Sequence, residues 1–167
     1  MEGIWTVAFY AQSASKVRRR KNMLKGLPDL LSPELLKTLA EMGHGDRIVI
    51  GDCNFPAASV AGDRKNIRCD GHRATEVLDA ILQLFPLDSF VEHPVIIMDK
   101  PAEQADLPTP VWDEFTQIVG KYDDRGKSAV TYTDRFSFYD LAKKSYAVVS
   151  TTEHAYYACI ILQKGCL

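Results

Sequence analysis

The sequence predicts one α/β domain with three layers, α/β/α, in which helices cover both faces of a mixed, mostly parallel sheet. Short runs rich in isoleucine and valine alternate with amphipathic segments of about ten to twelve residues, as expected for strands joined by crossover helices. The chain has 167 residues, of which 46% are hydrophobic and 25% are charged, which suits a domain with a sizeable core.

The first predicted helix covers residues 31–43, LSPELLKTLAEMG. Ser32 is a candidate N-cap, Pro33 suits the first helical position, and Gly43 is expected to end the helix in a left-handed turn. A buried strand is predicted in RIVIGD, residues 47–52, because its short apolar run is bounded by turn residues.

The rest of the chain alternates in the same way. Residues 54–66 are expected to form a loop because proline and glycine interrupt them. The last two predicted strands are joined by too few residues for a crossover helix, so we expect them to pair with each other antiparallel. The further predicted elements are a strand at 66–71, a helix at 74–85, a strand at 93–99, a loop at 100–110, a helix at 111–122, a strand at 128–134, a helix at 135–145, and strands at 146–152 and 158–165.

Composition argues against several classes of function. A net charge of −2 provides no basic footprint for nucleic acid. No apolar run approaches the roughly 18 residues that a membrane span needs. The four cysteines lack a C-x-x-C spacing, which favours free thiols in a reducing compartment over a metal site or a disulfide framework. Because no glycine-rich phosphate-binding motif follows a strand, a nucleotide cofactor is not expected.

Residues 1–22, MEGIWTVAFYAQSASKVRRRKN, are interpreted as an extension that precedes a domain at residues 23–167. Their weakly apolar part comes before the basic cluster, whereas a secretory signal has its positive charge first. Arginine, serine and a single acidic residue would also suit mitochondrial targeting, but we expect a disordered extension on a cytoplasmic protein.

His44 is the first candidate for acid–base chemistry. It lies between Gly43 and Gly45 at the corner between the first helix and the first strand, and α/β proteins build their sites at the ends of such elements. Asp46, two residues further on, could accept a hydrogen bond from the imidazole and so orient it and fix its tautomer. A structural histidine beside a turn-forming aspartate is the alternative that this pattern leaves open.

Further polar residues lie near the ends of predicted elements. Asp52 ends the buried strand and could accept hydrogen bonds from a polyhydroxylated ligand, although strand-ending aspartates are also common in turns. Tyr139 lies close to Arg135 in the sequence, and its phenol can both donate and accept. Tyr156 and Tyr157 are adjacent in a connecting segment, so at most one of them should face a site. These residue types suit acid–base chemistry on a neutral ligand that they do not identify.

Several blocks of the sequence together resemble a known family. They are LLSPELLKTLAEMGHGDRIVIGDCNFPA, IRCDG, LFPLDSF, DRFSFYDLAKKSYAVVSTTE and ILQKG, in this order. Over residues 24–167 the chain is similar to the L-fucose mutarotase/D-ribose pyranase family. Its Arg-Phe-x-Phe-Tyr block resembles the fucose branch, including the animal members.

The resemblance implies a cofactor-independent isomerase, an L-fucose mutarotase, which interconverts the α and β anomers of a free sugar by opening and reclosing the pyranose ring. One proton must leave the anomeric hydroxyl and one must reach the ring oxygen, and a histidine suits that exchange. The resemblance assigns catalysis to His44 and Tyr139. The residues that it assigns to sugar binding are Asp52, Asp88, Met98, Arg135, Tyr157 and Cys159.

The chain departs from the family pattern at Cys159, because the late Tyr-Gly-Asn signature of the family here reads Tyr-Ala-Cys. A thiol forms weaker hydrogen bonds than an amide, so the preferred sugar stays open. A D-ribose pyranase and a non-catalytic monosaccharide-binding protein are therefore kept as alternatives. The resemblance also implies a homo-oligomer in which the site is completed at a subunit interface.

Overall fold

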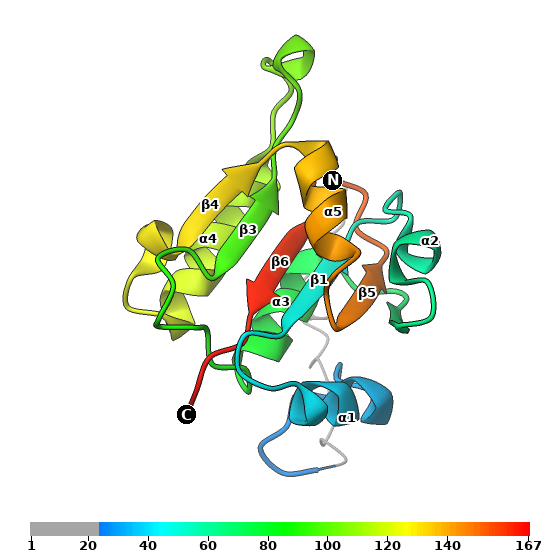
Figure 1. The fold of residues 1–167 in the computed structure, drawn as a ribbon, viewed down its shortest axis with the longest axis vertical. Coiled ribbons are helices and arrows are strands. Elements are labelled where there is room, and N and C mark those ends of the chain that lie inside the picture. The colour runs from blue at the N-terminus through cyan, green and yellow to red at the C-terminus, as the bar shows by residue number, and fades with distance from the viewer. Residues whose placement is uncertain (1–23) are drawn as a thin grey trace, which may run out of the picture.

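In the computed structural model, which describes residues 24–167, six strands form one mixed sheet (Figure 1). The strands are β1 Arg47–Gly51, β2 Lys65–Cys69, β3 Val95–Met98, β4 Val130–Thr133, β5 Ala147–Thr151 and β6 Ile160–Gln163. Their order across the sheet is β2-β5-β1-β6-β3-β4, and β6 is antiparallel to both of its neighbours. The other pairs are parallel, so the prediction of a mixed, mostly parallel sheet is confirmed. The extension predicted at residues 1–22 lies outside the described residues.

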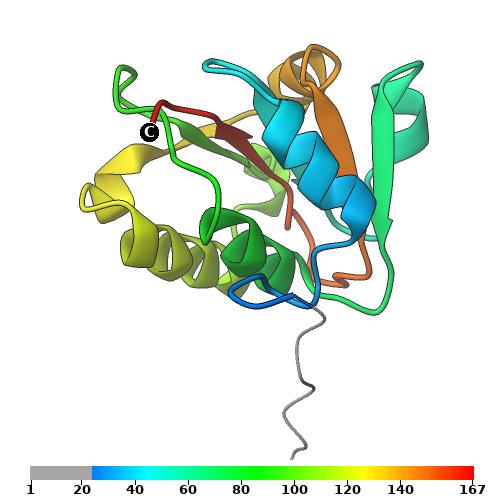
Figure 2. The same cartoon turned by 90° about the horizontal axis from the view of Figure 1, so that it is seen from below.

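Helices cover both faces of this sheet. They are α1 Pro33–Glu41, α2 Ala57–Ala61, α3 Ala74–Leu82, α4 Pro110–Tyr122 and α5 Arg135–Ala142, with the 3-10 turns η1 Ala102–Gln104 and η2 Gly126–Ala129. The larger hydrophobic cluster joins α1, α3 and α4 to one face of the sheet, and the smaller cluster joins α2 and α5 to the other. Figure 2 shows α3 and α4 on one side of the strands and α5 on the other, which gives the predicted three layers.

The central strand β1 shows why its sequence is apolar without interruption. Ile48 and Ile50 belong to the larger cluster and Val49 to the smaller one, and all three side chains are fully buried. Successive strand residues point to opposite faces, so a strand covered on both sides needs apolar residues at every position. Among residues 24–167, no helix is long and apolar enough to cross a membrane.

The expected pairing of the last two strands was wrong. β6 does run antiparallel, but β1 lies between β5 and β6, and β6 pairs with β1 and β3. A connection from residue 152 to residue 159 easily spans the two inter-strand spacings of about 5 Å each. The short connection excluded a parallel partner, and it left adjacency undecided.

Two further local expectations need correction. Residues 57–61 form α2 within the expected loop, because the small apolar side chains of this short helix are buried in the smaller cluster. The helix α1 begins as predicted, with the Ser32 hydroxyl accepting from the Leu35 N–H at 3.2 Å. It ends at Met42 in an extended conformation, and the left-handed turn lies at Gly45, with φ of 84°, rather than at Gly43.

Candidate active site

A cavity of about 330 Å³ lies at the edge of the sheet where β1 and β3 end and β6 begins, a size within the range of small-molecule sites. The strands bring three of its residues together: Asp52 follows β1, Met98 ends β3, and Cys159 precedes β6. Its full lining is Asp52, Asn54, Phe55, Met98, Arg135, Tyr139, Tyr156, Tyr157 and Cys159.

One wall of the cavity depends on a close approach of two chain segments. A Cβ atom on Gly51 would lie 2.7 Å from the Phe55 side chain, so a glycine lets the aromatic ring pack against the end of β1. The Phe55 ring in turn lies 5.7 Å from the ring of Tyr139 and 6.0 Å from that of Phe138, both on α5. These contacts fix the position of the Tyr139 phenol at the cavity.

Asp52 is buried beneath the cavity and is hydrogen-bonded on both carboxylate oxygens. Its Oδ1 accepts from the Asn54 N–H at 2.9 Å, and its Oδ2 accepts from the Cys159 thiol at 3.4 Å. Burial raises the pKa of Asp52, although these hydrogen bonds oppose the shift. Burial and the neighbouring Asp52 carboxylate raise the pKa of Cys159 far above its ordinary value, so the thiol stays protonated and acts as the donor.

Tyr139 and Arg135 come from the first turns of α5, whose N-cap Asp134 accepts from the N–H groups of Phe136 and Ser137. Burial raises the pKa of Tyr139, and the positive charge of Arg135 only partly offsets this. The phenol is therefore neutral near pH 7 and can donate one hydrogen bond while accepting another.

His44 lies at the opposite end of β1. Its Nε2 is 3.1 Å from the Asp88 Oδ2, and its ring lies 5.5 Å from that of Phe90. Asp88 is buried, and it also accepts from the Phe90 N–H and the Gln163 amide, both at 2.9 Å. Burial alone would raise the pKa of Asp88, but these hydrogen bonds and the one from His44 outweigh it and leave the pKa below its usual value.

Asp46 does not contact the His44 ring as we expected. Its carboxylate accepts the Gly43 N–H at 2.7 Å, because the left-handed turn at Gly45 directs the chain back on itself. The structure instead gives the orienting contact to Asp88, which the resemblance had assigned to sugar binding. Asp46 shapes the corner that carries His44.

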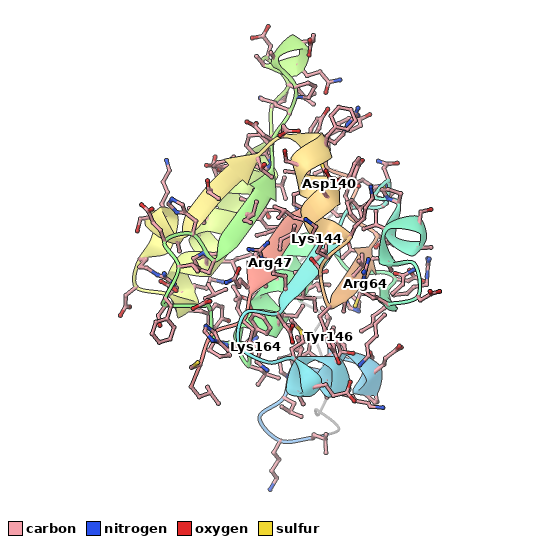
Figure 3. The ribbon with its side chains drawn as sticks, viewed as in Figure 1. Arg47, Arg64, Asp140, Lys144, Tyr146 and Lys164 are labelled. Atoms are coloured by element: carbon pink, nitrogen blue, oxygen red, sulfur yellow. The ribbon has the colours of Figure 1, made fainter. Side chains whose placement is uncertain are left out.

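The end of β6 holds this corner against the sheet. The Gly45 N–H donates to the Lys164 carbonyl at 2.8 Å, and the Lys164 backbone N–H donates to the Asp46 carbonyl at 2.8 Å. The Lys164 ammonium also donates to the carbonyls of Leu39 and Met42, at 2.7 and 2.6 Å, and so caps the end of α1 (Figure 3).

The predicted site residues therefore form two groups. Asp52, Met98, Arg135, Tyr139, Tyr157 and Cys159 line one cavity, whereas His44, Asp46 and Asp88 lie together elsewhere. The five residues of β1 separate the two groups, and a strand of that length spans about 16 Å. Within one chain, the imidazole and the cavity are thus at opposite ends of the central strand β1.

Sequence reasoning missed two residues that support the cavity. The Trp112 Nε1–H donates to the Tyr157 carbonyl at 3.0 Å, and the Tyr157 hydroxyl donates to the Gln104 side chain. Trp112 lies in the expected helix and Gln104 in the expected loop, and neither position carries a local signal for a distant partner. No group of three or more metal-binding side chains within residues 24–167 could hold a metal ion.

The cavity, the fold and a comparison with known proteins together indicate the class of protein. A polar cavity at the strand ends of a mixed α/β sheet is the usual position of a small-molecule site in an α/β protein. Residues 25–167 match the model of the RbsD / FucU transport protein family. The chain belongs to this family.

Relatives within the family are similar over most of their length. The chain is 47% identical to "Fucose mutarotase" of Homo sapiens over 147 residues, which covers 86% of this chain and 94% of the relative. The FucU structure from Bifidobacterium longum matches with 45% identity and a TM-score of 0.84, covering 86% of this chain and 99% of that one. A fucose mutarotase of Streptococcus pneumoniae, solved in complex with L-fucose, matches with 44% identity and a TM-score of 0.79 over the same shares.

Proposed function

We propose that this protein is an isomerase that interconverts the α and β anomers of L-fucose without a cofactor. The observation that carries the proposal is the cavity itself, which combines a buried carboxylate, a neutral phenol and a guanidinium from Asp52, Tyr139 and Arg135. Such groups suit the hydroxyls of a free monosaccharide. Relatives called fucose mutarotase, at 43–47% identity, and the L-fucose bound to the Streptococcus pneumoniae relative support the choice of sugar.

The chemistry requires only proton exchange. Ring opening removes a proton from the anomeric hydroxyl and delivers one to the ring oxygen, and closure on either face of the carbonyl gives the two anomers. In the proposal, Asp88 accepts the Nε2–H of His44, which leaves Nδ1 free to take and return the sugar proton. Tyr139 assists as a neutral phenol, and Asp52, Met98, Arg135, Tyr157 and Cys159 position the sugar.

His44 can take part only if another subunit brings it to the cavity. We therefore propose a homo-oligomer in which the His44 corner of one subunit completes the cavity of its neighbour. The exposure of side chains supports this arrangement. At the His44 corner, Phe90 is 77% exposed, and beside the cavity Phe136 and Tyr156 are 69% and 64% exposed. Contact between these two surfaces would remove apolar surface from water.

The cysteines support a cytoplasmic location in this proposal. Cys53, Cys69, Cys159 and Cys166 are all free thiols in the structure, as expected in a reducing compartment. Fusing residues 1–22 to a fluorescent reporter tests the alternative. A diffuse signal agrees with the cytoplasmic location, and a mitochondrial signal contradicts it.

The direct test measures anomer exchange of L-fucose by NMR saturation transfer. Wild-type protein should accelerate exchange above the rate in buffer, and His44→Ala should abolish the acceleration. His72→Ala, which changes a half-exposed histidine beside Glu76, is the matched control and should retain wild-type exchange. Wild-type protein that leaves the buffer rate unchanged would exclude the proposed function.

The thiol at Cys159 favours keeping two alternatives in the same experiment. It occupies the cavity with a weaker hydrogen-bonding group than an amide, which could shift the preferred sugar or reduce turnover. Exchange of D-ribose but not L-fucose would indicate a pyranase. Calorimetric binding of L-fucose without exchange would indicate a sugar-binding protein.

A further inference from the structure

Tyr157 has an unusual backbone conformation for a residue that lines the cavity. Its φ is 56°, in the left-handed region, and it is the only non-glycine residue with positive φ among residues 24–167. An L-residue with a Cβ atom adopts this conformation at a cost in free energy, so other contacts must hold it there. Both neighbours, Tyr156 and Ala158, also have side chains, so no adjacent glycine relieves the turn.

Two hydrogen bonds from outside the 152–159 segment hold Tyr157 at its two ends. The indole Nε1–H of Trp112 donates to the Tyr157 carbonyl at 3.0 Å, and the Tyr157 hydroxyl donates to the Gln104 side-chain oxygen. One contact fixes the strained backbone and the other fixes the phenol. Together they determine the direction in which the ring borders the cavity.

The donor Trp112 and the acceptor Gln104 are themselves held in place by the elements that carry them. Trp112 lies in the first turn of α4, where its ring packs 5.1 Å from that of Tyr132 and beneath the Lys100 ammonium at 5.6 Å. Gln104 ends the turn η1 in the segment between β3 and α4, residues 99–109, which projects from the sheet at the top of Figure 1. Lys100 closes that segment by donating to the Leu107 carbonyl at 2.5 Å.

We infer that Trp112 and Gln104 are positioning residues for sugar binding by Tyr157: Trp112 holds its left-handed backbone, and Gln104 holds its phenol. Neither residue lines the cavity, and each acts through Tyr157. The inference rests on the proposed function for its kinetic consequence. Its structural consequence, the rigidity of the 152–159 segment, is independent of the substrate.

The test compares Trp112→Phe with the wild type in two measurements. Phenylalanine keeps an aromatic ring in the packed position but removes the N–H donor. We expect the KM for L-fucose to rise about five- to tenfold, with kcat within about twofold, as for loss of one hydrogen bond that orders a binding group. Backbone amides of residues 152–159 should exchange with deuterium about tenfold faster without any sugar present.

Tyr122→Phe is the matched control. Tyr122 lies in α4, as Trp112 does, and the change removes its phenol hydrogen bond to Asp79 of α3 at 3.2 Å. It should leave the KM and the exchange of residues 152–159 unchanged. A folded Trp112→Phe variant with wild-type KM and wild-type amide exchange would overturn the inference. So would a fall in kcat at constant KM, because a positioning role in binding predicts the opposite split.

Gln104→Ala keeps the inference testable if Trp112→Phe fails to fold, since Gln104 is exposed on the surface. Gln104→Ala and Tyr157→Phe break the same hydrogen bond. The double variant should therefore show the same KM as the single variant with the higher KM. Additive effects would contradict a shared contact. If wild-type protein does not exchange L-fucose anomers, the proposed function fails, while deuterium exchange still decides whether Trp112 holds Tyr157.

Discussion

At the residue scale, the contact between Cys159 and Asp52 gives the cavity its particular chemistry. A protonated thiol and a carboxylate form a buried hydrogen bond of 3.4 Å, and the raised pKa values of both groups follow mainly from their burial. The carboxylate therefore meets a sugar with one of its oxygens already engaged by a weak donor. A sugar hydroxyl can compete with a thiol for that oxygen more easily than with an amide.

Replacing Cys159 by alanine should lower the free energy of unfolding by about 1–3 kcal/mol, because one oxygen of buried Asp52 loses its side-chain donor. Cys159→Ser keeps a donor of similar size and is the matched variant, expected to lose less. Urea unfolding at pH 7 measures both. Equal losses in the two variants would show that the thiol contributes packing and not a hydrogen bond.

The lowered pKa of Asp88 predicts how the free energy of unfolding depends on pH in the acidic range. Its pKa is lowered in the folded protein, so the unfolded chain takes up its proton first as the pH falls. The stabilisation is therefore complete above about pH 4 and is lost as the pH falls through the lower, folded value.

Urea midpoints measured between about pH 3 and pH 7 should fall less steeply for Asp88→Asn than for the wild type. The variant should also be less stable than the wild type at pH 7. Asp106→Asn, at an exposed position between β3 and α4, should follow the wild-type curve. If the urea midpoint of Asp88→Asn fell with pH as steeply as that of the wild type, other carboxylates would be responsible for the loss of stability in acid.

At the element scale, one wall of the cavity depends on the packing of Phe55 against Gly51, the last residue of β1. A methyl group at Gly51 would lie 2.7 Å from the Phe55 side chain, so the ring would have to move. We expect Gly51→Ala to cost about 1–3 kcal/mol of stability and to weaken sugar binding, as for other overpacked sites.

Gly43→Ala is the control for this change. Its Cβ would have Asp46 Oδ2 as nearest neighbour at 3.8 Å, and its backbone is not left-handed, so stability should be nearly unchanged. Calorimetry with L-fucose and urea unfolding compare the two variants. Unaltered binding by Gly51→Ala would show that the Phe55 wall does not contribute to affinity.

The same elements show what a sequence can and cannot predict. Asp52 and Tyr139 could be proposed from the sequence because Asp52 follows a predicted strand and Tyr139 lies in a predicted helix, whereas Met98 was proposed only through the family resemblance. The short helix α2 could not, because burial against the sheet and not an amphipathic period stabilises it.

Contacts between distant segments were equally inaccessible. Asp88 contacts His44 although 44 positions separate them in the sequence, and Trp112 contacts Tyr157 across 45 positions. Proximity in sequence favoured Asp46 as the partner of His44, but the turn at Gly45 directs its carboxylate elsewhere. The separation of His44 from Asp52 does follow from the sequence, because the predicted strand lies between them. Local patterns do not encode which distant residues gather at each end of that strand, such as Asp88 beside His44 and Cys159 beside Asp52.

At the scale of the whole molecule, the proposed sharing of the site between subunits predicts complementation. His44→Ala and Tyr139→Phe should each be inactive or severely impaired as pure proteins. If His44 serves the cavity of a neighbour, co-expression of the two variants should restore activity, because about a quarter of the sites in randomly mixed oligomers regain both residues.

The NMR exchange assay on co-purified mixed oligomers measures this recovery. Mixing two separately purified variants under conditions that prevent subunit exchange is the control and should restore nothing. Mixed oligomers without recovered activity would contradict a site that is shared between subunits.

The position of β6 has a consequence for how the chain folds. Strands β2, β5 and β1 form one parallel group and β3 and β4 another, and β6 alone bridges them. Because β6 is the last strand in chain order, a chain made from its N-terminus has two incomplete half-sheets with exposed edges until residues 160–163 emerge. Closure of the sheet, the cavity floor and the His44 corner should then occur in one late, cooperative step.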